Sequence, residues 1–195
     1  ISPEHFVSGE RIPPEGAYHT IAFHRKHPEW TAVGKFTYEH AIAVDVLETL
    51  PEVDTKRIGA MGHSLGGHGA IFLAAYDERI RVTVCNCGAP GFRYNPKVLD
   101  WARDRWYVYF KPLRSLLLAQ RLPNIDFHEI IALIAPRAFM DVSALNDGIS
   151  LTQRHRVVML LKVAEVYELL NASNQYAYFV HGWGHSVPYM SRELI

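Results

Sequence analysis

A serine between closely spaced glycines is the feature of this sequence that most directly suggests chemistry. The run Gly62-His63-Ser64-Leu65-Gly66 fits the pattern G-x-S-x-G and separates a short apolar segment from a segment with helical character. In such a turn the serine backbone is strained, and a side chain at Gly62 or Gly66 would clash with neighbouring backbone. The pattern predicts Ser64 as a nucleophile. It also predicts the Leu65 N–H, at the start of the following helix, as an oxyanion donor.

A serine hydroxyl needs a base to take its proton, and two histidines compete for that role. The last expected strand, residues 175–180, runs directly into His181, while His185 follows two glycines. The carboxyl ends of parallel strands share one edge of a sheet, and ligands bind at that edge. A histidine at the strand end tends to be packed, whereas glycines let a loop bring an imidazole over Ser64. We therefore favour His185 as the base and keep His181 as the alternative.

A histidine base is oriented by a carboxylate, and again two residues compete. Asp147 lies in the loop that follows the expected strand at residues 138–142. Asp141 lies inside that strand and would point at a helix layer. We therefore favour Asp147 as the acid and keep Asp141 as the alternative. The three residues then come in the chain order Ser64, Asp147, His185.

Elements that alternate along the chain are expected to position these residues. Apolar, valine-rich segments predict four strands, and apolar residues at 3–4 spacing predict helices between them. The strands are expected at residues 57–62, 81–87, 138–142 and 175–180, and the helices at 35–50, 70–76, 113–120 and 154–170. This alternation predicts an α/β fold with a mostly parallel sheet and helices on both faces. The first 33 residues, rich in proline, are expected to form an ordered loop.

Composition excludes several other classes of protein. The chain has 195 residues, which fits a single domain over residues 1–195. Twenty basic and twenty acidic residues balance, so no net field favours nucleic acid, and no apolar run reaches the length of a membrane span. Cys85 and Cys87 are expected to be buried thiols. The spacing of His24, His27 and His40 fits no common metal site, so we expect solvated histidines, no metal and no cofactor.

The motifs together resemble the α/β-hydrolase superfamily. Residues 51–68 are similar to its dienelactone-hydrolase-like, acetyl-xylan-esterase-like and prolyl-oligopeptidase-like branch, as are residues 77–80, 134–137 and 184–186. The resemblance covers roughly residues 9–190. It implies a carboxylesterase-like serine hydrolase that cleaves a small-molecule ester through an acyl-enzyme, with Ser64, Asp147 and His185 as the triad. A prolyl-oligopeptidase-like peptidase and a non-catalytic interaction module are the alternatives.

One departure from that superfamily concerns the start of the chain. In the superfamily several strands precede the strand that leads to the serine, and an early loop supplies a second oxyanion donor. Here one expected helix and a loop precede it, without an HGG-type turn. We therefore expect a chain that corresponds to the C-terminal part of such a hydrolase. Its uncovered sheet edge predicts an oligomer in which copies complete the sheet.

Overall fold

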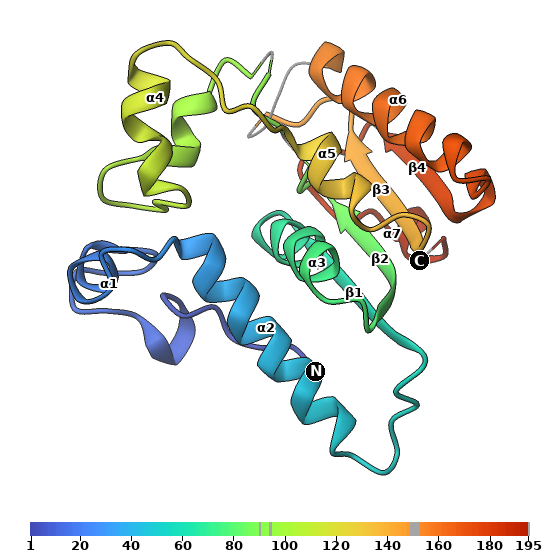
Figure 1. Cartoon of the computed structure of the whole chain (residues 1–195), viewed down its shortest axis with the longest axis horizontal. Helices are drawn as coiled ribbons and strands as arrows, with labels where there is room; N and C mark the ends of the chain where they lie inside the picture. Colours follow the sequence, from blue (N-terminus) through green and yellow to red (C-terminus); the bar gives the residue numbers. More distant parts are fainter. Residues whose placement is uncertain (90, 94, 149–152, 195) are drawn as a thin grey trace. The chain divides into compact units, whose positions relative to one another are not determined.

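Four parallel strands form the sheet that leads to Ser64 (Figure 1). The strands are β1 (Ile58–His63), β2 (Ile80–Asn86), β3 (Ala138–Ala144) and β4 (Tyr176–His181). Hydrogen bonds join them in the order β1-β2-β3-β4, so strands that follow one another in the chain are neighbours in the sheet. The expected α/β fold with a parallel sheet is confirmed.

Helices between the strands form a layer against this sheet. They are α3 (Leu65–Tyr76), α5 (Phe127–Ala132) and α6 (Gln153–Leu169), and the short η4 (Ser173–Gln175) and α7 (Tyr189–Arg192) flank β4. Helix α3 packs on β1 and β2, α6 packs on β4, and α5 contacts both α3 and α6. Helix α3 begins at Leu65 rather than at the expected residue 70, because Gly66 and Gly67 are poor helix formers that mask its first turn in the sequence.

Arg137 fixes the connection between α3 and β2. One guanidinium nitrogen donates to the carbonyls of Asp77 and Ile80, and another donates to the carbonyl of Ala74. These carbonyls lie at the end of α3 and the start of β2, and the last carbonyls of a helix have no partner within the helix. The arginine thereby anchors the far end of the helix whose first turn holds Ser64.

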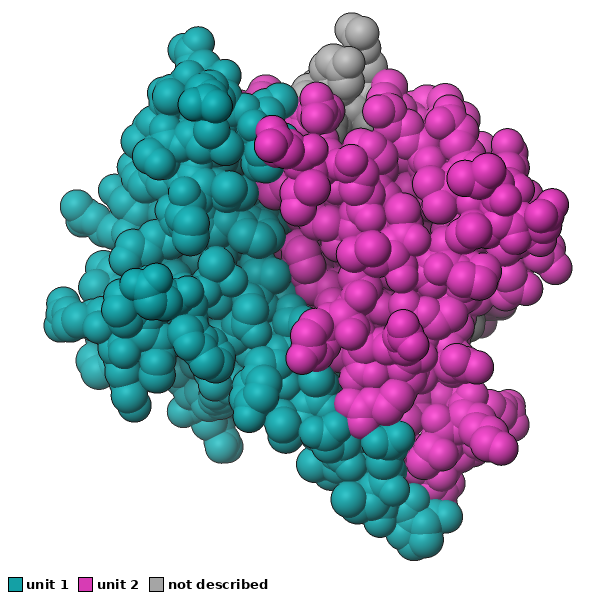
Figure 2. Space-filling view, viewed as in Figure 1, with its two compact units in different colours: residues 1–51, 97–123 teal, residues 52–96, 124–195 magenta. Residues whose placement is uncertain are grey.

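The structure is a computed structural model that describes residues 1–89, 91–93, 95–148 and 153–194, with the backbone alone described for 153–155. Figure 2 colours two compact units, residues 1–51 with 97–123 and residues 52–96 with 124–195. The sheet belongs to the second unit; the prediction of a single domain stays a prediction. Within the described ranges, no helix is both long enough and apolar enough to cross a membrane.

The first unit consists of helices and loops. Its elements are η1 (Gly9–Arg11), α1 (Ile21–Lys26), α2 (Ala32–Glu48), η2 (Val98–Ala102), η3 (Lys111–Leu113) and α4 (Arg114–Leu118). Phe36 of α2 packs near Tyr109, and Trp101 lies edge-on to Tyr109. The expectation of a loop over the first 33 residues was wrong for α1, a helix too short to show an apolar period.

His24 of α1 corrects a second expectation in this unit. We expected a solvated side chain, but His24 is buried and its Nε2 lies 3.3 Å from the Val108 carbonyl oxygen. Burial lowers the pKa of its imidazole. A buried neutral imidazole that donates to this carbonyl is a structural group rather than a solvated one.

Candidate active site

Ser64 occupies the sharp turn between β1 and α3. Its backbone has φ 55° and ψ −116°, a conformation that L-residues rarely adopt. The Ser64 N–H donates to the Asn86 carbonyl at 2.8 Å, which ties the turn to the end of β2. Leu65 is the first residue of α3, so its N–H lies in the first turn, where helix geometry provides no partner. The turn therefore has the strained geometry that the glycine pattern predicted.

The glycines around this turn have unequal roles. A Cβ on Gly62 would overlap the Gly66 carbonyl group, as expected, but a Cβ on Gly66 would meet open space. The expectation of crowding at Gly66 was wrong, because the Gly66 backbone makes the close approach to Gly62, whereas a Cβ on Gly66 would point away from it. Gly88, which the motif did not include, is tightly packed: a Cβ there would lie 2.7 Å from Gly67 Cα and 2.8 Å from the Ser64 carbonyl oxygen.

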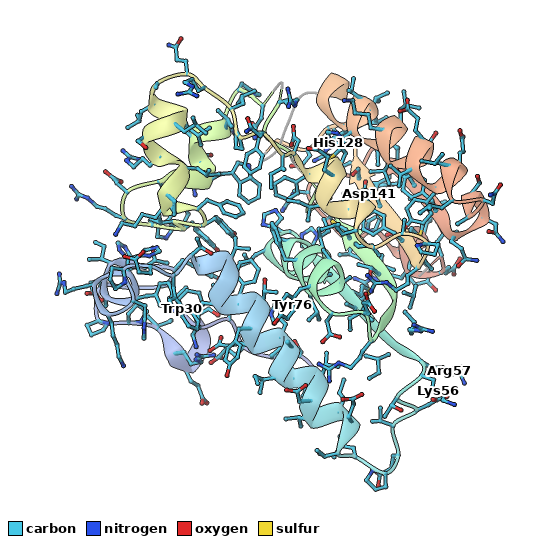
Figure 3. All side chains as sticks on the ribbon, viewed as in Figure 1. Trp30, Lys56, Arg57, Tyr76, His128 and Asp141 are labelled. Atoms are coloured by element: carbon cyan, nitrogen blue, oxygen red, sulfur yellow. The ribbon has the colours of Figure 1, made fainter. Side chains whose placement is uncertain are left out.

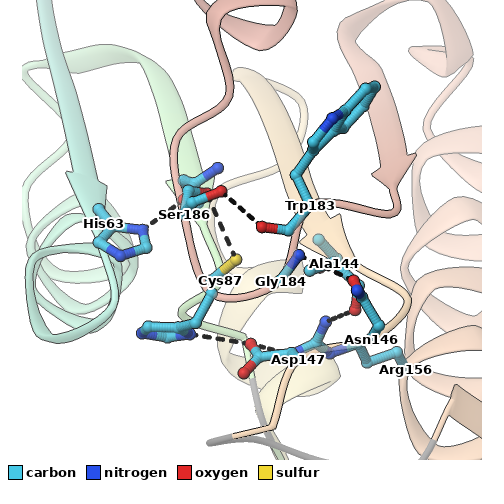
Figure 4. Close-up of polar contacts among 12 residues, drawn as sticks. His63, Cys87, Ala144, Asn146, Asp147, Arg156, Trp183, Gly184 and Ser186 are labelled. Atoms are coloured by element: carbon cyan, nitrogen blue, oxygen red, sulfur yellow. Dashed lines mark hydrogen bonds and ion pairs between the residues drawn. The ribbon is translucent and has the colours of Figure 1, made fainter.

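Asp147 and His185 are brought together by the loops that follow β3 and β4. His185 Nδ1 donates to Asp147 Oδ2 at 2.9 Å, the Asp147 side chain is fully buried, and the His185 side chain is 15% exposed. Two hydrogen bonds hold the two loops side by side: Gly184 N–H donates to the side-chain Oδ1 of Asn146 at 2.8 Å (Figure 4), and Leu145 N–H donates to the His181 carbonyl. With its proton on Nδ1, the imidazole keeps a free lone pair on Nε2.

Arg156 of α6 is part of this arrangement and was missed by the sequence reasoning. Its guanidinium donates to the Ala144 carbonyl at 2.7 Å and to Asp147 Oδ2 at 3.1 Å, and its side chain is 5% exposed. A buried carboxylate is costly unless it is paired and hydrogen-bonded, and Arg156 supplies both requirements. The residue belongs to no motif, and only its place in the fold reveals the contact.

The two alternative residues have other partners. His181 is buried at the end of β4, where its Nδ1 accepts from the Trp183 N–H, and burial lowers its pKa. Asp141 is buried on β3 (Figure 3), where Ser143 donates to its Oδ1. Burial raises the pKa of Asp141 to about 6. The structure thus pairs His185 with Asp147 and places His181 and Asp141 in packed positions.

His63 lies between the loop that carries His185 and the turn that carries Ser64. The ring centroids of His63 and His185 lie 4.7 Å apart, and His63 Nδ1 donates to Asn86 Oδ1. His185 therefore lies beside the residue that precedes Ser64. Among the described residues, Ser64 Oγ has no hydrogen-bond partner, so the expected contact between Ser64 and His185 is not formed in this structure. Such contacts are often long in resting enzymes and shorten on substrate binding.

The sheet, the strained serine turn and the Asp147–His185 pair at one sheet edge define a member of the α/β-hydrolase superfamily, which confirms the resemblance. The family model described as "Glucuronyl esterase, fungi" matches residues 15–171, and the chain belongs to this family of esterases. The motifs alone indicated only the superfamily and one of its branches, whereas the family model distinguishes this esterase family within it.

Curated relatives share part of the sequence. Carbohydrate esterase MZ0003, from an unknown prokaryotic organism, is 28% identical over 132 residues, 61% of this chain and 29% of that protein. The putative hydrolase YtaP of Bacillus subtilis (strain 168) is 30% identical over 117 residues, 60% of this chain and 36% of that protein. The chain therefore spans about a third of the length of these curated relatives.

Solved structures share the fold. A glucuronoyl esterase from Solibacter usitatus superposes with a TM-score of 0.71 at 22% identity, over 85% of this chain and 47% of that one. A carbohydrate esterase family 15 glucuronoyl esterase from Caldicellulosiruptor kristjansonii superposes with a TM-score of 0.70 at 22% identity, over 95% of this chain and 55% of that one. About half of each solved chain thus corresponds to the fold described here.

Proposed function

We propose that this chain carries the catalytic triad of a serine esterase, with Ser64 as nucleophile, His185 as base and Asp147 as acid. The observation that carries the proposal is the 2.9 Å bond from His185 Nδ1 to buried Asp147, in a loop that also lies against the residue before Ser64. That bond fixes the imidazole tautomer in which Nε2 can accept a proton. No metal or cofactor takes part in the proposed reaction.

The proposed reaction proceeds through an acyl-enzyme. Ser64 Oγ attacks the ester carbonyl carbon while His185 Nε2 takes the hydroxyl proton, and the Leu65 N–H donates to the oxyanion. The imidazolium that forms faces the Asp147 carboxylate, which Arg156 holds in place. His185 then gives its proton to the leaving alcohol, and a water molecule repeats the sequence to release the acid and restore Ser64.

We propose a glucuronic acid ester of a carbohydrate as the substrate class. The family to which the chain belongs supports this choice, as do the glucuronoyl and carbohydrate esterases among its relatives. A small-molecule ester of this class has a carboxyl carbon attached to a sugar ring. Its alcohol part leaves with the proton from His185.

Covalent labelling and hydrolysis together test this proposal. The chain should hydrolyse the benzyl ester of glucuronic acid, and a fluorophosphonate should label Ser64, as located by mass spectrometry. Ser64→Ala should abolish labelling. Ser186→Ala is the matched control, because Ser186 lies in the same sheet-edge region and should leave the label in place. A label on any other residue would assign the nucleophile elsewhere, and an unlabelled chain without hydrolysis would instead favour a non-catalytic interaction module.

The position of β1 at the end of the strand order, among the described residues, supports a further proposal about assembly. β1 lies at one end of the sheet order, and its Met61 side chain is 65% exposed. An unpaired strand presents backbone donors and acceptors that another strand can bind. We propose that two copies pair along β1. Light scattering should then report a dimer, and Met61→Lys should convert it to a monomer; a monomeric parent chain would refute this pairing.

A further inference from the structure

Cys87 lies at the same sheet edge as the proposed triad, and the proposed mechanism does not use it. The residue follows β2 directly, in the left-handed conformation with φ 52°, and its N–H donates to the Val142 carbonyl of β3. Its side chain is buried, and its Sγ lies 4.0 Å from the Ser186 carbonyl oxygen in the histidine loop (Figure 4). The thiol is therefore built into the region between the ends of β2, β3 and β4.

Three metal-ligating groups converge at this point. Cys87 Sγ, one carboxylate oxygen of Asp147 and one ring nitrogen of His185 all lie within 4.8 Å of one another. Thiolate, carboxylate and imidazole are the ligands that Zn²⁺ uses, at bond lengths of about 2.0–2.3 Å. A cation at their centre requires shifts of about 1 Å or less in groups that lie on loops. The partly exposed His185 side chain gives an ion a route from solvent.

The charges around these groups favour a cation despite the nearby guanidinium. Arg156 is paired with Asp147 and with the Ala144 carbonyl, so two of its guanidinium nitrogens are directed at those acceptors. Asp141, which also interacts with Arg156, adds a second buried carboxylate. Above pH 6 the two carboxylates against one guanidinium leave a net negative charge, which a divalent cation compensates. Burial raises the pKa of the Cys87 thiol, so the thiolate forms as the cation binds.

We propose that Cys87, Asp147 and His185 form an inhibitory site for a thiophilic divalent cation of the Zn²⁺ class. The cation would bind Cys87 as thiolate and His185 through Nδ1, with the thiol proton released to solvent. The Nδ1 proton moves to Nε2 by exchange with solvent, because a neutral imidazole carries one proton. Nε2 then has no lone pair to accept the Ser64 proton, and Asp147 binds the cation instead of His185. The ion thus removes the base and the acid together.

This inference rests on the proposed function for its inhibitory consequence, but not for the site itself. Cobalt(II) is a suitable probe of the site, because a thiolate bound to Co²⁺ gives a charge-transfer absorption band that zinc does not. The unmodified chain should develop this band when titrated with Co²⁺, and Zn²⁺ should displace it. Because the band is independent of catalysis, it decides the site even if the chain hydrolyses no ester.

Variants of the two cysteines provide the specific test. Cys87→Ser should lose the cobalt band, while Cys85→Ser, the matched control two residues earlier within β2, should keep it. His185→Ala tests the site a second time if Cys87→Ser fails to fold, and should weaken Co²⁺ binding on the order of 10-fold or more. A band that survives in Cys87→Ser, or a folded parent chain with no band at millimolar Co²⁺, would overturn the proposal.

Inhibition is measured as the Zn²⁺ concentration that halves each variant's own metal-free rate of ester hydrolysis. That concentration should rise on the order of 10-fold or more in Cys87→Ser and stay unchanged in Cys85→Ser. Equal inhibition of the parent chain and Cys87→Ser would show that zinc acts elsewhere. A cobalt band without any ester hydrolysis would refute the proposed function and retain the metal site, whereas hydrolysis without the band would refute the metal site alone.

Discussion

The end of β1 and the ends of β3 and β4 contribute to the same site in different ways. At the end of β1, backbone geometry determines the position of Ser64: a left-handed conformation, a glycine that admits no Cβ and a backbone bond to Asn86. At the ends of β3 and β4, side chains determine the positions, because Arg156, Asp147 and His185 hold one another. The first region therefore depends on glycines, and the second depends on charge pairing.

The largest expected effect comes from the proposed nucleophile, Ser64. Ser64→Ala should lower kcat on the order of 10⁶-fold, because no other group in the proposed reaction can form the acyl-enzyme. Steady-state hydrolysis of the benzyl ester of glucuronic acid measures this loss, and the circular dichroism spectrum should stay unchanged. A variant that keeps most of the parent activity would show that the strained turn does not hold the nucleophile.

The two carboxylates of β3 and its loop provide the next test. Asp147→Asn should lower kcat about 10⁴-fold, because an amide no longer fixes the His185 tautomer or stabilises the imidazolium. Asp141→Asn is the matched control and should keep most of the activity, since Asp141 is bonded to Ser143 and not to His185. The opposite ranking of the two variants would mean that the wrong carboxylate has been assigned as the acid.

Arg156 tests whether charge pairing positions the base. Arg156→Met should lower kcat on the order of 10²-fold with KM nearly unchanged, because Asp147 loses its partner and the His185 ring loses its fixed position. Arg156→Lys should restore part of kcat, since an ammonium retains the positive charge beside Asp147. The recovery should be incomplete, because an ammonium lacks the planar pair of nitrogens with which the guanidinium also binds the Ala144 carbonyl. A loss of thermal stability without a change in kcat would assign Arg156 a structural role only.

A pair of glycine variants tests the backbone-dependent region. Gly62→Ala should destabilise the fold by about 3 kcal/mol or more, because its Cβ would overlap the Gly66 carbonyl. Gly66→Ala should instead be neutral or raise stability by up to about 1 kcal/mol, because its Cβ meets open space in a helix. Urea unfolding of both variants measures the difference, and similar effects in the two would contradict the turn geometry.

The smallest expected effect is a pH dependence of stability from Asp141. Burial raises its folded-state pKa from 3.8 to about 6, so the folded state retains this proton at a higher pH than the unfolded chain does. The contribution to the free energy of unfolding therefore falls as pH rises from about 4 to 6, by at most about 3 kcal/mol. Asp141→Asn should match the parent near pH 4 and exceed it above pH 6; equal denaturant midpoints at both pH values would contradict the shift.

The strands and the pairing of Asp147 with His185 were predictable because parallel strands bring successive loops to one edge. A residue's place after a strand was enough to favour Asp147 over Asp141 and His185 over His181. Arg156 and Cys87 were not predictable in the same way. The contacts of Arg156 depend on how α6 packs against the loop after β3. Those of Cys87 depend on Asp147 and His185, which lie in two other segments of the chain. His24 was misjudged because α1 is too short to show a buried face in its sequence pattern.

The order of the strands has a consequence for biosynthesis. Ser64, Cys87, Asp147 and His185 follow β1, β2, β3 and β4 in turn, so the base leaves the ribosome last of these groups. A nascent chain that has exposed β1 to α6 can form the serine turn and the buried Asp147–Arg156 pair while His185 is still absent. Because the proposed base follows β4, the Ser64 hydroxyl has no base to activate it until β4 has left the ribosome and joined the sheet. In the proposed mechanism, the order of synthesis thereby delays activation of Ser64 until β4 is in place.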